Sequence, residues 1–170
     1  MTQLNNSMDL IMLSYGKTCY VAQNFESTIR TLLVVLRSQK DKQPVTPNAI
    51  LEIEKETHRK VLGVLFYETE AVKHFSADER KIVIPAIEAR NHIMHGFWDE
   101  NIKLFLMPEG TNQIVMKLDA LRSTIKQADE IVVARIDQLW AQYGLSTETF
   151  KMKAKQIAEF AALDEYVIKH

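Results

Sequence analysis

Residues that break regular structure are scarce in this chain of 170 residues. It contains five glycines and four prolines, about half the share of a typical globular protein. This scarcity excludes a collagen-like chain and favours long helices. With 46% hydrophobic and 25% charged residues, the chain can bury a hydrophobic core, which excludes a disordered protein. We therefore expect one globular domain over residues 1–170.

Cysteine and long apolar segments are also nearly absent. The single Cys19 cannot form a disulfide within the chain, which is typical of proteins from reducing compartments. The longest apolar run, 32–36, is far shorter than the roughly 20 residues that cross a membrane as a helix. The first residues contain neither the basic nor the apolar part of a secretion signal. These features predict a cytoplasmic protein that does not contact a membrane.

No charge of one sign dominates the sequence. It has 21 Lys and Arg against 22 Asp and Glu, with a formal net charge of −1. Proteins that wrap around duplex nucleic acid are usually basic, so the balance argues against that function. Any contact with a nucleic acid must then come from a local patch or from a small catalytic site.

Apolar residues recur at steps of three and four along most of the chain, as they do on one face of a helix. These patterns predict helices over four segments: 8–38, 47–75, 110–143 and 147–162. Asp9 is placed to cap the first helix, and Thr46 the second, because Pro47 follows it at the first helical position. Residues 1–7 are expected to form a flexible N-terminus, and 147–170 a C-terminal helix and tail.

A further helix begins after Ser76, which forms the pattern of a capping box with Glu79. It should run to about Trp98 with a kink at Pro85, and 99–109 should be a connector. No segment has the alternating pattern of a strand. We therefore predict an all-α fold, an antiparallel four-helix up-and-down bundle with an additional C-terminal helix.

The residues best suited to chemistry lie in the segment 88–100, EARNHIMHGFWDE. At 100° per residue, one polar stripe of the predicted helix contains Glu88, His92, His95 and Asp99. Arg90 falls on the opposite, apolar arc. Because an unpaired charge inside a core is very costly, Arg90 needs a partner, and Glu26 on the first helix is a candidate. One hypothesis for Arg90 is therefore a buried ion pair that only stabilises the fold.

The sequence of Arg90, Asn91 and His95 resembles the R-x4-6-H motif of the HEPN superfamily in its RN…H form. The Gly-Phe-Trp that follows is similar to residues that often trail this motif, and the small helical bundle is similar to the HEPN architecture. The resemblance implies a homodimer that brings two motif helices together around one cleft. Many HEPN members are metal-independent endoribonucleases, often toxins of toxin–antitoxin or phage-defence systems. The resemblance thus implies an RNA substrate, an antitoxin as a candidate partner, and a reaction that uses no metal or cofactor.

The resemblance also assigns a role to each motif residue. His95 would be the general acid or base at the ribose 2′-OH and the leaving oxygen, since an imidazole titrates near neutral pH. Arg90 would stabilise charge on the pentacoordinate phosphate with its planar fork of donors. Asn91 would orient the site or bind the phosphate. Candidates for supporting roles are Glu88, His92 and Asp99.

Two features depart from the resemblance. Phe97 occupies the position where some HEPN toxins have a tyrosine that a nucleotidyltransferase modifies, so that modification is excluded. Arg90 and His95 are about 140° apart on an ideal helix. They meet only if Arg90 reaches round the helix, if the helix is irregular near Pro85 or Gly96, or if a dimer completes the site.

Two alternatives to a ribonuclease remain open from the sequence. The polar stripe of Glu88, His92, His95 and Asp99 offers nitrogen and oxygen ligands of the kind that zinc accepts, although its spacing matches no known metal motif. A non-catalytic HEPN-like protein that binds RNA, a nucleotide or a protein partner is the second alternative.

Overall fold

The computed structural model describes residues 2–40, 62–68, 70–107 and 109–142. Its elements in chain order are α1 (Thr2–Lys40), α3 (Leu62–Glu68), the 3-10 helix η1 (Ala71–His74), α4 (Ala77–His95), α5 (Phe97–Phe105) and α6 (Gly110–Ala141). All regular structure in these ranges is helical, which confirms the all-α fold. None of the described helices is long and apolar enough to cross a membrane.

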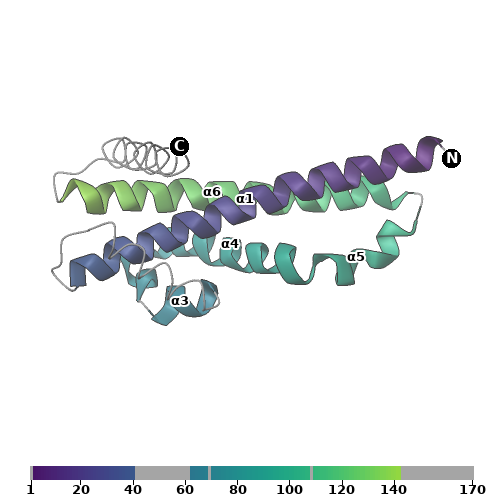
Figure 1. Cartoon of the computed structure of the whole chain (residues 1–170). Coiled ribbons are helices and arrows are strands. Elements are labelled where there is room, and N and C mark those ends of the chain that lie inside the picture. Colours follow the sequence, from purple (N-terminus) through teal and green to yellow (C-terminus); the bar gives the residue numbers. More distant parts are fainter. Residues whose placement is uncertain (1, 41–61, 69, 108, 143–170) are drawn as a thin grey trace, which may run out of the picture.

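The long helices form a bundle of three rods, α1, α4 with α5, and α6 (Figure 1). Successive rods alternate in direction, so that α1 and α6 run the same way. The second of the four expected helices is represented by α3 and η1, which pack near the Lys40 end of α1. The rest of 47–75, the cap at Thr46 and the whole of 147–162 lie outside the described residues.

The core lies between these rods and is formed by apolar residues at helical spacing. Its largest fully buried side chains include Phe25, Ile29, Phe66, Phe97, Ile114 and Leu118. Helix α1 begins at Thr2, so residues 2–7 belong to the helix and the predicted cap at Asp9 is wrong. Helix formation continues there because the chain contains no Pro or Gly before Gly16.

The segment 47–75 is not one continuous helix, because it is interrupted between α3 and η1. Glu70 has a φ of 57°, a left-handed conformation that a continuing helix cannot contain. Its backbone N–H donates to the carbonyl of Tyr67 at 3.1 Å. This turn ends the helical ladder and redirects the chain towards α4.

The capping box predicted before α4 is confirmed. The Glu79 backbone N–H donates to Ser76 Oγ at 3.2 Å, and the Ser76 N–H donates to Glu79 Oε2 at 2.7 Å. Arg135 of α6 donates to both Glu79 carboxylate oxygens at 3.0 Å. The start of α4 is therefore fixed by local capping and by an ion pair to α6.

The end of the predicted helix is wrong, because α4 stops at His95 and 99–109 is not a connector. Gly96 separates α4 from α5 with a φ of −128° and a ψ of −17°. Helix α5 is stabilised by the buried Asn101, which donates to the Phe97 carbonyl at 2.8 Å and accepts from Lys117 Nζ at 2.7 Å. The rod thus continues past the motif as a second, short helix.

Candidate active site

Arg90 is paired with the residue that the sequence suggested. Its Nη2 donates to Glu26 Oε2 on α1, and its Nη1 donates to Asn91 Oδ1 at 2.9 Å. Arg30, one turn after Glu26, donates to Glu26 Oε1 from Nε at 3.1 Å and from Nη2 at 2.6 Å. The four residues form one cluster across the α1–α4 interface.

This cluster has more positive than negative charge and is mostly shielded from water. The side chains of Arg30, Arg90 and Glu26 are 10%, 12% and 18% exposed. Burial alone would raise the pKa of the Glu26 carboxyl. The hydrogen bonds and charges of the two arginines outweigh this effect, so the pKa lies below its ordinary value. Two guanidiniums thus share one carboxylate, and Arg30 Nη1 and Arg90 Nε are buried without a hydrogen-bond partner among the described residues.

His95 lies apart from this cluster. It is exposed at the end of α4, and among the described residues no hydrogen bond joins it to Arg90. His92 is partly buried, with Nδ1 3.5 Å from Glu100 Oε1 and its ring 5.8 Å from that of Phe97. Within one protomer, the structure brings Asn91 to Arg90 but brings neither histidine to it.

Two of the three ways in which Arg90 and His95 could meet are not used. Arg90 does not reach round the helix, because its guanidinium is bound to Glu26. Helix α4 continues without interruption from Ala77 to His95, through Pro85 and up to Gly96. Of the three routes, the one that remains is a dimer in which a second copy completes the site.

The polar stripe does not form a metal site in the described part of the chain. Glu88, His95 and Asp99 are exposed, and Gly96 places Asp99 on a different helix from the other two. No group of three His, Cys, Asp or Glu side chains in the described ranges could hold a metal ion. The zinc alternative therefore gains no support from these residues.

Sequence reasoning missed two parts of this site. The first part is Arg30, whose spacing of four from Glu26 is that of a helical ion pair and was the signal for it. An aromatic cluster also packs the end of the motif against α1. The Tyr15 ring lies 4.8 Å from Trp98, and the Tyr15 hydroxyl donates to the Ile93 carbonyl at 3.1 Å. The sequence signal for this aromatic cluster was the apolar face of α1, which includes Tyr15.

The chain was also compared with known proteins. No protein-family model matches it, and no curated protein or solved structure does.

Proposed function

We propose that this chain is a HEPN-like, metal-independent endoribonuclease whose site is completed by a second copy. The surplus positive charge of the cluster that holds Arg90 is the main support. Glu26 and Asn91 fix the Arg90 guanidinium on α4, five residues before His95. A guanidinium held in place by other side chains is suited to stabilise a phosphate during reaction.

The reaction would use the substrate's own 2′-OH as nucleophile. One imidazole accepts the 2′-OH proton while the oxygen attacks phosphorus, and a protonated imidazole donates to the departing 5′-oxygen. The products are a 2′,3′-cyclic phosphate and a free 5′-hydroxyl. His95 is the first candidate for this transfer because it is exposed, and His92 is the second. Arg90 would offset the charge that develops on the phosphate oxygens.

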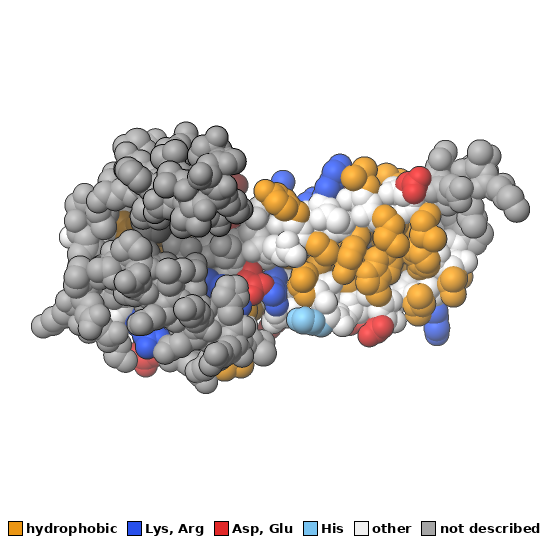
Figure 2. Space-filling model, in the orientation of Figure 1, with side chains coloured by type: hydrophobic (Ala, Val, Ile, Leu, Met, Phe, Trp, Pro, Cys, Tyr) orange, Lys and Arg blue, Asp and Glu red, His pale blue; other side chains and the backbone are white. Residues whose placement is uncertain are grey.

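An exposed apolar surface beside the motif supports association with a second copy. Figure 2 shows apolar side chains gathered over the N-terminal half of α1 and over α5. Large apolar side chains exposed on these elements include Met8, Met12, Leu13 and Ile102. Apolar patches of this kind mark interaction surfaces. A homodimer through this surface and the end of α4 would place two sets of motif residues near one axis, and an antitoxin protein could cover the same surface.

A second candidate function is favoured by the ion pair itself. Arg90 is only 12% exposed and its Nη2 is already bound to Glu26. These are the properties of a residue that stabilises the fold. The chain would then be a non-catalytic helical protein that binds RNA, a nucleotide or a protein partner.

Mixing two inactive variants tests the proposed site. Arg90→Ala and His95→Ala should each abolish RNA cleavage measured in excess EDTA, whereas Glu130→Ala, at an exposed position of α6, should retain it. If Arg90 of one copy acts with His95 of the other, a mixed dimer contains one intact site, and random exchange restores about a quarter of the wild-type rate. A dimeric wild-type protein that cleaves no RNA would support the non-catalytic alternative.

A further inference from the structure

Arg30 is the member of the buried cluster to which the motif assigns no role. Its Nε and Nη2 both donate to Glu26 Oε1, at 3.1 and 2.6 Å, while Arg90 Nη2 donates to the other oxygen, Oε2. Each arginine thus holds one oxygen of the same carboxylate. The remaining Nη1 of Arg30 is buried without a hydrogen-bond partner in the described part of the chain, so Glu26 is the group that Arg30 binds.

Arg30 lies on the far side of Glu26 from His95. Helices α1 and α4 run in opposite directions (Figure 1), and Glu26 lies opposite Arg90. Because Arg30 follows Glu26 on α1, it lies towards the start of α4, whereas His95 is at the end of that helix. A phosphate held between Arg90 and His95 is therefore nearer to Arg90 than to Arg30. Any effect of Arg30 on such a phosphate is exerted through Glu26 and not by contact.

The net charge of the cluster depends on Arg30. With it, two guanidiniums and one carboxylate have a net charge of +1. Without it, Arg90 and Glu26 would form a neutral pair. These side chains are only 10–18% exposed, so salt and water screen them less than they screen surface charges. A phosphate that approaches Arg90 therefore meets a positive cluster instead of a neutral ion pair.

We propose that Arg30 is a positioning residue of the site: it offsets the charge of Glu26, so that Glu26 can hold Arg90 in place without neutralising it towards a phosphate. This role rests on the proposed ribonuclease function. Glu26 orients the Arg90 guanidinium, Arg30 compensates the carboxylate, and Arg90 contacts the phosphate. Removal of Arg30 should therefore weaken phosphate binding, and removal of Glu26 in the same chain should reverse that loss.

Binding of a labelled 2′-O-methyl RNA oligonucleotide of mixed sequence, followed by fluorescence anisotropy, tests this role. The methyl group blocks the 2′ oxygen, so the oligonucleotide binds without being cleaved. Arg30→Gln should weaken binding roughly tenfold or more, because it removes one unit charge from the cluster. Arg30→Lys keeps that charge and should bind within about threefold of the wild type. Glu26→Gln combined with Arg30→Gln leaves Arg90 as the only charge of the cluster and should restore the wild-type affinity.

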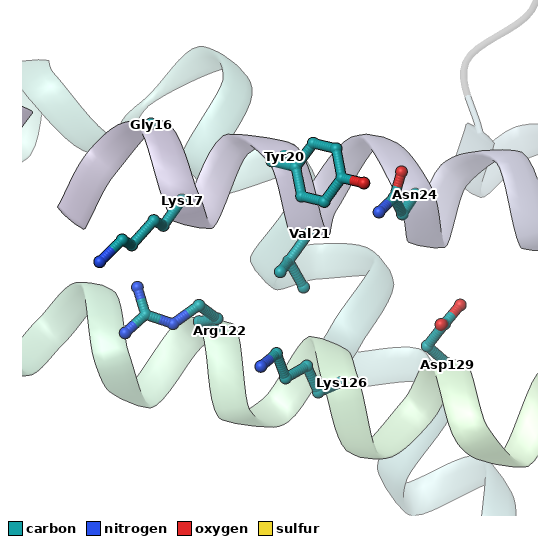
Figure 3. A pocket seen from close by; sticks show the side chains of 8 residues that line it. All are labelled: Gly16, Lys17, Tyr20, Val21, Asn24, Arg122, Lys126 and Asp129. Carbon is teal, nitrogen blue, oxygen red and sulfur yellow. The ribbon is translucent and has the colours of Figure 1, made fainter. Parts of the chain in front are cut away.

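Arg122→Gln is the matched control for the loss of an arginine from an ion pair. Arg122 pairs with Asp119 on α6 and lies beside Lys17 in the groove between α1 and α6, away from the Arg90 cluster (Figure 3). Its replacement should leave the affinity unchanged. Far-UV circular dichroism should show the same helix content in all variants. Arg30→Met removes the same charge and provides a second measurement if Arg30→Gln does not fold.

Cleavage of unmodified RNA by the wild type in excess EDTA tests the proposed function separately. If the wild type cleaves RNA and Arg30→Gln binds the oligonucleotide as tightly as the wild type does, the role of Arg30 is overturned while the ribonuclease stands. The role is also overturned if the double variant binds as weakly as Arg30→Gln, or if Arg122→Gln weakens binding to the same extent. A wild type that neither binds the oligonucleotide nor cleaves RNA overturns the ribonuclease and the role of Arg30 together.

Discussion

Removal of Glu26 should destabilise the fold more than removal of either arginine that it binds. Glu26→Ala leaves two guanidiniums together without a counter-charge, and these side chains are only 10% and 12% exposed. Arg90→Ala leaves Glu26 paired with Arg30 through two hydrogen bonds. Breaking a buried ion pair typically costs 3–5 kcal/mol, and residual contact with water lowers this. We expect losses of about 3 kcal/mol for Glu26→Ala and about 1–2 kcal/mol for Arg90→Ala.

Urea unfolding followed by far-UV circular dichroism measures these differences, provided that the slope of the free energy against urea is the same in all variants. Glu88→Ala is the matched control, because Glu88 is exposed on the same helix as Arg90. It should change the free energy of unfolding by less than about 0.5 kcal/mol. If Arg90→Ala destabilises the chain as much as Glu26→Ala, the shared-carboxylate reasoning is refuted.

The same measurement separates stability from activity at Arg90. A loss of about 1–2 kcal/mol leaves a typical domain folded, so inactive Arg90→Ala protein would have lost a catalytic group and not its structure. Arg90→Lys keeps the charge but has no planar fork. It should therefore recover part of the stability and little of the RNA cleavage.

Three further outcomes test other parts of the fold. The hydrogen bonds and charges of Arg30 and Arg90 hold the pKa of Glu26 below its ordinary value of 4.5, so its ionised form stabilises the fold above that pH. The advantage of wild type over Glu26→Gln should shrink in urea unfolding as the pH falls below 4.5, and a constant difference would contradict the shift. Ser76→Ala should cost about 1 kcal/mol by removing a helix cap, and an unchanged melting temperature would argue against that cap. Gly110→Ala should lower the melting temperature, because an added Cβ would lie 1.8 Å from a backbone oxygen of α5. At Gly16 an added Cβ meets no described atom within 4 Å apart from its chain neighbours and its own helix backbone. Gly16→Ala should therefore raise stability by about 0.5–1 kcal/mol, and melting-temperature shifts of the same sign for the two variants would refute this contrast.

Local sequence patterns predicted the long helices and the start of α4. Apolar spacing is a property of each segment alone, and the Ser76–Glu79 box needs only residues three apart. The break at Glu70 was missed because a left-handed glutamate has no sequence signature comparable to glycine. Helix α5 was missed because its stability depends on Asn101, which is bound by Lys117 from the next helix.

The candidate site was predicted only in part, because local patterns identify its residues but not all of their contacts with other helices. Arg90 lies on an apolar arc, and a buried charge needs an opposite charge beside it. That requirement made Glu26 a candidate partner. The groove between α1 and α6 could not be found, because it depends on two helices far apart in sequence running in the same direction. Only that alignment places Lys17 beside Arg122 and Asn24 beside Asp129.

A structural role for Arg90 does not exclude a catalytic role. A guanidinium has five N–H donors. Arg90 uses Nη2 for Glu26 and Nη1 for Asn91, while its Nε has no partner in the described part of the chain. Glu26 is shared with Arg30, so it neutralises only one of the two cations. The ion pair that joins α1 to α4 therefore leaves positive charge in the cluster. It also fixes the rotation of α4 against α1, which keeps Arg90 facing the α1–α4 interface and leaves His95 exposed.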